Sequence, residues 1–100
     1  MQRPKPATPD ELVSFLAGNS SWAEETGRLL RSYRFRDFRE AMAFMTRVAE
    51  HAERLDHHPN WSNVYNRVEV QLLTHDVQAI TVLDFELARC MDGEARTLAG

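Results

Sequence analysis

A change of hydrophobic period around residues 57–59 limits this chain to mixed α and β structure. Over residues 37–56, apolar residues recur at three- and four-residue steps with charged residues between them, which predicts a long amphipathic helix. Asp37 can cap this helix, with Glu40 three residues later, and Pro59 prevents the helix from continuing. Over residues 63–74, apolar and polar residues alternate, which is typical of a strand with one buried face. The helix stripe that we expect in the core consists of Phe38, Ala41, Met42, Met45, Val48, Ala49, Ala52 and Leu55.

Two further structured segments precede this helix. Thr8 can cap a first helix, with Glu11 completing a capping box, and Gly18 should end it. Residues 22–35 mix aromatic and polar residues in short alternations, which we interpret as two short antiparallel strands. Residues 1–7 are polar and rich in proline, and we expect them to form a loose tail.

After the strand, residues 77–81 form either a short partner strand or a turn. Thr81 can cap a final helix with Asp84 at its third position, and Gly93 should end that helix. Residues 94–100 are expected to be a loose tail. The face of the 63–74 strand that we expect to be buried contains Val64, Asn66, Val68, Val70 and Leu72.

The order of these elements predicts a single α+β domain over residues 1–100, with helices covering one face of a small antiparallel sheet. The other face and any open edge would need cover, which a second subunit can supply. With 43% hydrophobic residues, 27% charged residues and a net charge of -3, the chain lacks the broad basic surface of a nucleic-acid binder. A single cysteine, Cys90, and the absence of a signal-peptide pattern or an apolar run of about 20 residues predict a cytoplasmic protein with no membrane segment.

Three histidines near the change of period suggest proton-transfer chemistry, because imidazole exchanges protons near neutral pH. His57 should lie at the helix C-terminus, where partial negative charge favours an imidazolium. Glu53 precedes it by four residues, so that carboxylate should orient the His57 ring if the helix persists. The proline after His58 favours an extended backbone at His58, so the His58 side chain should point in a different direction from that of His57. His75 closes the strand-like segment.

The predicted strand raises a problem of distance for these histidines. A straight strand from residue 64 to residue 74 would span about 33 Å and carry His75 away from His57. Residues 59–63 must therefore double back, or the strand must bend, or two subunits must share one site.

Several short motifs are spread over residues 29–92. They are Glu53-x-x-x-His57-His58-Pro59, Trp61, Asn63-Val64-Tyr65-Asn66, Thr74-His75-Asp76, Thr81-x-x-Asp84, Phe35-x-x-Phe38 and Phe44-Met45-x-x-Val48-Ala49. Because elements at several separate spacings agree at once, this range resembles the pterin-4a-carbinolamine dehydratase family specifically. The residues before Trp22 match that family only loosely.

The resemblance implies three helices on one face of a four-stranded antiparallel sheet. It also implies association through that sheet into homodimers or homotetramers. The implied reaction is dehydration of 4a-hydroxytetrahydropterin to quinonoid dihydropterin, which recycles the pterin cofactor of aromatic amino-acid hydroxylases. The substrate is then a small pterin, and the reaction needs neither a metal nor an organic cofactor, because N5 of the pterin supplies the electron pair.

Matched residue by residue, His57, His58 and His75 correspond to the catalytic and pterin-contacting histidines of the family. The 4a-hydroxyl needs an acid to leave as water, and the N5 proton needs a base. We therefore expect His57 and His75 to exchange protons and His58 to contact the substrate. The residues expected to bind or orient the substrate are Glu53, Pro59, Trp61, Thr74 and Asp84.

Several of these residues also have purely structural interpretations. Asp84 can be a simple capping acid, and Trp61 and Tyr65 can be ordinary sheet or interface aromatics instead of stacking on pterin. His51 lies mid-helix without a motif, and Cys90 should be buried filler. We interpret one group of four arginines as a solvent-exposed rim, with a partner surface as the alternative. These are Arg31, Arg34, Arg36 and Arg39.

Residues 77–80 depart from the family pattern, which often has small residues, commonly a glycine pair, at this point. Here the segment is Val77-Gln78-Ala79-Ile80. Without glycine, backbone with positive φ is disfavoured, so the turn and access to the site are expected to differ.

Two other functions compete with catalysis. Adjacent His57 and His58 rarely direct both rings at one metal ion, and no H-x-x-x-H spacing exists, so a metal site is disfavoured. A non-catalytic interaction protein of the same fold, such as a transcription coactivator or an enzyme-assembly factor, is the second alternative. The retained histidines favour catalysis over it.

Overall fold

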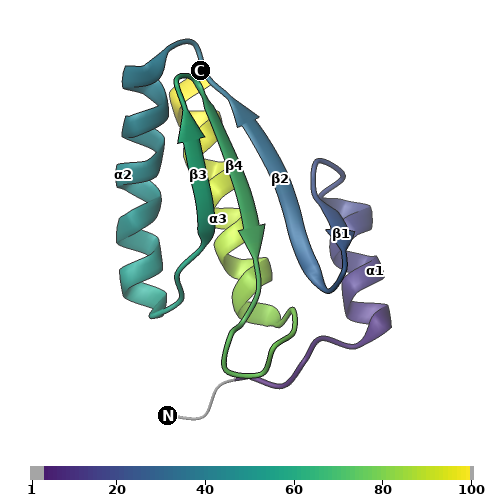
Figure 1. The fold of residues 1–100 in the computed structure, drawn as a ribbon. Coiled ribbons are helices and arrows are strands. Elements are labelled where there is room, and N and C mark those ends of the chain that lie inside the picture. The colour runs from purple at the N-terminus through teal and green to yellow at the C-terminus, as the bar shows by residue number, and fades with distance from the viewer. Residues whose placement is uncertain (1–3, 100) are drawn as a thin grey trace.

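The computed structural model describes residues 4–99 and shows three helices with a four-stranded antiparallel sheet (Figure 1). This arrangement confirms the predicted α+β class. Residues 1–3 of the expected N-terminal tail, and Gly100 of the expected C-terminal tail, lie outside the described range. In chain order the elements are α1 (Pro9–Gly18), β1 (Ala23–Glu25), β2 (Arg28–Arg34), α2 (Phe38–Leu55), β3 (Asn60–Val64), β4 (Arg67–Leu72) and α3 (Val82–Ala99).

The strands are ordered β1-β2-β4-β3, so the central pair joins segments that are distant in the chain. β2 and β4 pair along their whole length, from Leu29 opposite Leu72 to Arg34 opposite Arg67. β1 is shorter and pairs only with residues 28–30 of β2. The edge of β2 that β1 covers is therefore open after Leu30. In the view of Figure 1, α3 runs behind the sheet, α2 lies alongside it, and α1 lies next to β1.

The prediction of one strand over residues 63–74 is wrong, because the chain reverses inside it. β3 and β4 form a hairpin whose turn is Tyr65 and Asn66, with Tyr65 in the left-handed region at φ 51°. Asn66 Nδ2 donates to the carbonyl oxygen of Phe35 at 2.9 Å, which holds the turn against the end of β2. Val64 lies opposite exposed Arg67 and is itself 64% exposed instead of buried.

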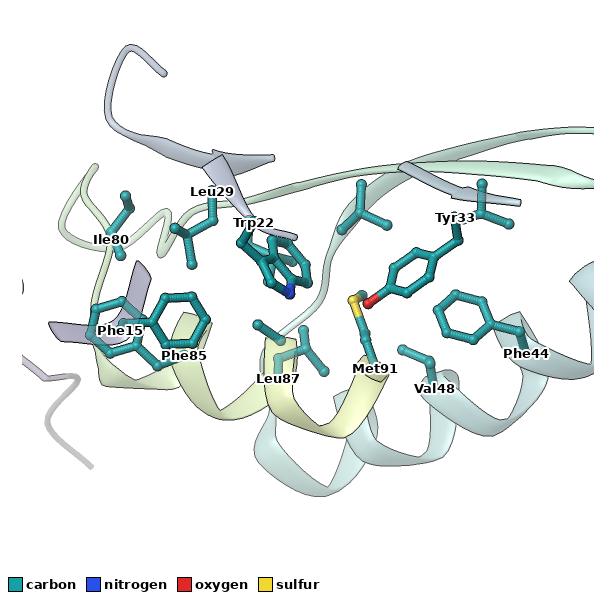
Figure 2. Close-up of a cluster of buried hydrophobic side chains, with 14 of the residues drawn as sticks. Phe15, Trp22, Leu29, Tyr33, Phe44, Val48, Ile80, Phe85, Leu87 and Met91 are labelled. Atoms are coloured by element: carbon teal, nitrogen blue, oxygen red, sulfur yellow. The ribbon is translucent and has the colours of Figure 1, made fainter. Parts of the chain in front are cut away.

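A continuous apolar core fills the space between the sheet and the helices (Figure 2). Phe44 of α2 and Met91 of α3 are fully buried, and the Tyr33 ring of β2 lies 4.7 Å from the Phe44 ring between centroids. Near the start of α3, Phe15 stacks on Phe85 with centroids 4.6 Å apart. The core therefore extends along much of α3 and ties α1 to it.

Three residues of the predicted helix stripe lie outside this core. Phe38 is 49% exposed, Met42 is 40% exposed, and Ala49 is also exposed. Phe38 and Met42 line a shallow cavity beside Tyr65. The stripe that faces the sheet is narrower than predicted, and its buried members are Ala41, Phe44, Val48 and Ala52.

The predicted starts of the first two helices are confirmed. Thr8 caps α1 with the complete capping box, because its hydroxyl accepts from Glu11 N–H at 3.1 Å while Glu11 accepts from Thr8 N–H at 2.8 Å. Asp37 caps α2 by accepting from Glu40 N–H at 2.9 Å. The side chains at these two starts thus satisfy backbone donors that have no partner inside the helix.

The prediction that the last helix ends at Gly93 is wrong, because α3 continues to Ala99. A glycine inside a helix costs about 1 kcal/mol relative to alanine, which packing on its C-terminal side can offset. Ala95 and Leu98 pack against the core, so the apolar stripe continues past the glycine. Among residues 4–99, no helix is long and apolar enough to cross a membrane.

Candidate active site

All three predicted histidines line one cleft of about 710 Å³ at the C-terminal end of α2. Its lining comes from the end of that helix, the residues that follow it directly, and the turn after β4. A volume of this size is in the range of small-molecule sites. The lining residues are Arg54, Leu55, Asp56, His57, His58, His75 and Asp76.

The end of α2 determines where the two adjacent histidines go. Asp56 adopts the left-handed conformation, with φ 50° and ψ 45°, and its N–H donates to the carbonyl oxygens of Ala52 and Glu53. The His57 N–H also donates to the Ala52 carbonyl oxygen, at 3.0 Å. Because the chain turns sharply here, His57 points inward and is 3% exposed, whereas His58 remains exposed.

His57 is paired with a buried carboxylate. Its Nε2 lies 2.6 Å from Asp84 Oδ1, and Asp84 has no exposed surface. Asp84 Oδ2 accepts from the Thr81 N–H at 2.9 Å and from the Thr74 hydroxyl at 2.8 Å. Because Asp84 Oδ2 already accepts two hydrogen bonds and His57 is the remaining partner at Oδ1, we assign His57 Nε2 as the donor in the pair. Asp84 thus both caps α3 and fixes the orientation of the His57 ring.

The predicted pairing of Glu53 with His57 is wrong. Glu53 Oε2 instead lies 2.6 Å from His58 Nε2, and both side chains are more than half exposed. The left-handed residue at position 56 ends the helical spacing on which the prediction depended. Glu53 therefore pairs with His58, whereas Asp84 pairs with His57.

His75 reaches the cleft from the turn between β4 and α3. Thr74 and Ala79 form an isolated antiparallel bridge that closes this turn, so residues 77–81 are a turn and not a partner strand. Gln78 adopts φ 52° without a glycine, and its Nε2 donates to the His75 carbonyl oxygen at 2.8 Å. The turn therefore forms despite the departure from the family pattern, and this side-chain bond supports the backbone that carries His75.

The other predicted site residues lie around the cleft instead of lining it. Thr74 is buried behind His57 in the hydrogen-bond network of Asp84. Pro59 is half-buried between the histidines and β3, and Trp61 is half-buried on β3 opposite Val70, packed against the core.

Sequence reasoning missed four residues of the lining. Asp76 belongs to a motif in the sequence but has no predicted role, and no site role is predicted for Arg54. Arg54 lies three residues before His57, and Asp76 directly follows His75. This closeness to the motif histidines is the signal in the sequence that could identify both residues. The missed residues are Arg54, Leu55, Asp56 and Asp76.

The fourth histidine and the cysteine lie outside the lining of this cleft. His51 Nε2 pairs with Glu94 Oε2 at 2.8 Å, which links α2 to α3. Cys90 is half-buried, with Arg54 Nη2 3.8 Å from its sulfur. Within residues 4–99, no three His, Cys, Asp or Glu side chains gather closely enough to hold a metal ion.

Known proteins with similar sequences carry the corresponding family name. Residues 5–93 match the family model described as Pterin 4 alpha carbinolamine dehydratase. A relative from Bradyrhizobium sp. (strain ORS 278), named "Putative pterin-4-alpha-carbinolamine dehydratase", is 55% identical over 90 residues, covering 88% of this chain and 90% of the relative. A relative of the same name from Synechococcus sp. (strain WH7803) is 59% identical over 71 residues, covering 71% of this chain and 76% of the relative.

A solved structure shares the fold as well. The crystal structure of a protein from Brucella melitensis, described as a transcriptional coactivator/pterin dehydratase, is 40% identical with a TM-score of 0.88, covering 91% of this chain and 99% of that one. The chain belongs to the pterin-4a-carbinolamine dehydratase family.

Proposed function

We propose that the protein dehydrates 4a-hydroxytetrahydropterin to quinonoid dihydropterin by histidine acid–base catalysis, and so recycles the pterin cofactor of aromatic amino-acid hydroxylases. The observation that supports this most is the set of three histidines along one cleft, one of them held by a buried carboxylate, in a chain of this family. His57, His58 and His75 are the catalytic and substrate-contacting residues of the proposal.

The chemistry needs one acid and one base. A protonated imidazole donates to the 4a-hydroxyl, the C4a–O bond breaks, and water leaves. The N5 lone pair forms the C4a–N5 double bond, and a neutral imidazole accepts the N5 proton, so the net change is loss of one water molecule. Such positioned acid–base groups contribute about 10²–10⁴-fold each to a rate.

His57 and His75 are assigned to these two proton transfers. Asp84 holds the His57 ring in one orientation by a hydrogen bond of 2.6 Å. His75 lines the same cleft from the turn after β4. His58, exposed and paired with Glu53, is assigned to substrate contact. Trp61 lies outside the cleft lining, so stacking on pterin is not part of the proposal.

The direct test is a coupled assay. A hydroxylase generates 4a-hydroxytetrahydropterin, and quinonoid product is followed by absorbance with and without this protein. The proposal predicts acceleration proportional to the concentration of the protein. A rate equal to the spontaneous dehydration would contradict it.

A second candidate function is protein binding, which an exposed apolar patch favours. Phe38, Met42, Val64 and Tyr65 are each at least 40% exposed, and three of them line one shallow cavity. Exposed apolar clusters often mark interaction sites. The description of the Brucella melitensis protein as a coactivator agrees with such a role. A folded protein without dehydratase activity would favour this candidate.

We further propose that the chain forms homodimers or homotetramers through its sheet. The sheet ends in two open edge strands, β1 and β3, which need protection or a partner. Light scattering after size exclusion should give two or four times the chain mass of 11.5 kDa. A monomer at micromolar concentration would contradict this. The cytoplasmic location and the lack of nucleic-acid binding stay predictions from the sequence.

A further inference from the structure

A second cavity, of about 550 Å³, lies along the open edge of β2, near the C-terminal end of α3. The loop after α1 and the last turns of α3 complete its walls. Asp84 of the histidine site and Arg96 of this cavity are twelve residues apart on α3, or about 18 Å. The cavity is therefore separate from the histidine cleft. Its charged lining residues are Arg31, Arg34, Arg36, Glu40, Asp92 and Arg96.

Both acids of this cavity are already engaged by donors of the protein. Asp92 accepts from Trp22 Nε1 at 3.0 Å, from Arg31 Nη1 at 2.7 Å and from the Tyr33 hydroxyl. Glu40 accepts from the Arg36 N–H at 2.9 Å, and its other oxygen lies 3.6 Å from the Arg36 guanidinium. These contacts neutralise the charges of two of the four arginines.

Two arginines of the cavity remain without a counter-charge. Within the described residues 4–99, neither Arg34 nor Arg96 has an ion pair or a side-chain hydrogen bond. Arg34 also lies opposite Arg67 in the β2–β4 register, and like charges directly opposite each other are unfavourable. A bound anion would relieve that repulsion.

Arg31 adds a preorganised donor to the same cavity. Its guanidinium is held by Asp92 and lies over the Tyr33 ring, 4.2 Å from the centroid. Its Nε is buried and has no hydrogen-bond partner. The contacts with Asp92 and Tyr33 hold the Arg31 guanidinium in place beside the cavity.

From these observations we infer that the cavity binds a phosphate-class dianion, either free phosphate or a phosphate monoester. The two uncompensated guanidinium groups match its charge, and guanidinium donors match the geometry of phosphate oxygens. The hydroxyls of Ser20 and Ser21 on the cavity wall are further donors of the kind that phosphate accepts.

The test is calorimetric titration of the full chain with inorganic phosphate, glycerol 2-phosphate and acetate at one fixed ionic strength. Both phosphates should bind, and acetate should bind at least about tenfold more weakly, because a charged hydrogen bond contributes about one factor of ten. Tighter binding of the monoester would identify esters as the ligands, and tighter binding of inorganic phosphate would identify the free ion. Equal binding of acetate and phosphate would overturn the inference.

Charge-matched variants locate the site. Arg34→Gln and Arg96→Gln should each weaken phosphate binding about tenfold or more. Arg39→Gln removes an exposed arginine outside the cavity and should leave the affinity unchanged. All three positions are exposed, and thermal melts will verify that each variant is folded. Wild-type affinity in both cavity variants, or an equal loss in Arg39→Gln, would refute the site.

Discussion

At the scale of single residues, the Asp84 carboxylate links the stability of the protein to its proposed chemistry. It has no exposed surface and accepts hydrogen bonds from His57, the Thr81 N–H and the Thr74 hydroxyl. Removal of one partner from a buried network leaves the others unsatisfied. In the proposed reaction Asp84 is a positioning residue, because its contact is with His57 and not with the substrate.

Asp84→Asn tests that role. The amide cannot accept at both former oxygens, so we expect a loss of about 1–3 kcal/mol of unfolding free energy and a lower kcat. Urea denaturation and the coupled dehydration assay measure the two effects. Glu86→Gln, an exposed acid on the same helix, is the control. Wild-type stability together with a wild-type pH profile of kcat in Asp84→Asn would show that the pair has no role.

Tyr33 gives a prediction for alkaline pH. Burial, and then its hydrogen bond to Asp92, raises the pKa of the Tyr33 hydroxyl above its ordinary value of about 10. The unfolded chain therefore loses this proton first as the pH rises. Tyr33 contributes stability that is complete below pH 10 and that falls above it, by up to about 1.4 kcal/mol per pH unit.

Tyr33→Phe should remove this alkaline loss while costing about 1 kcal/mol at neutral pH for the deleted hydrogen bond. Urea unfolding of both proteins between pH 9 and about 11 measures the difference. Tyr65 is 62% exposed, so Tyr65→Phe is the matched control. Parallel stability curves for wild type and Tyr33→Phe would contradict the account.

At the scale of elements, local signals predicted the helices better than they predicted the hairpin. The cap residues Thr8 and Asp37 act through neighbours three residues away, so the sequence alone identifies both helix starts. The turn at Tyr65 and Asn66 has no glycine, and its support comes from the distant Phe35 carbonyl oxygen. Such long-range support is not visible in a local pattern.

The cap of α1 provides a test at this scale. Thr8→Ala removes one of the two capping hydrogen bonds and should destabilise the protein by about 0.5–2 kcal/mol. Chemical denaturation measures this shift, with Ser14→Ala on the exposed face of α1 as control. An unchanged denaturation midpoint for Thr8→Ala would show that α1 forms independently of its cap.

The candidate site shows the same division between local and tertiary information. The three histidines were found from residue type and motif, but their partners were assigned by helical spacing. The left-handed Asp56 breaks that spacing, so Glu53 pairs with His58, and the partner of His57 comes from α3. The site residues were thus predictable as a set, whereas their pairing depends on tertiary structure.

At the scale of the whole molecule, the hairpin explains how distant histidines share one cleft. Because β3 and β4 run in opposite directions, the chain leaves α2 and returns to the same end before the His75 turn. The long separation of His57 and His75 that one straight strand would impose therefore does not arise within a single chain. Along α3, the histidine cleft lies near the N-terminal end and the arginine-lined cavity near the C-terminal end.

The most direct test of the account is the turnover of 4a-hydroxytetrahydropterin by folded histidine variants. His57→Ala and His75→Ala should each lower kcat by about 10²–10⁴-fold, because each removes one proton-transfer group. His51→Ala, which removes an imidazole outside the cleft lining, should retain most of the activity. Wild-type turnover in both cleft variants, with circular dichroism confirming their fold, would contradict the assignment of these histidines to the reaction.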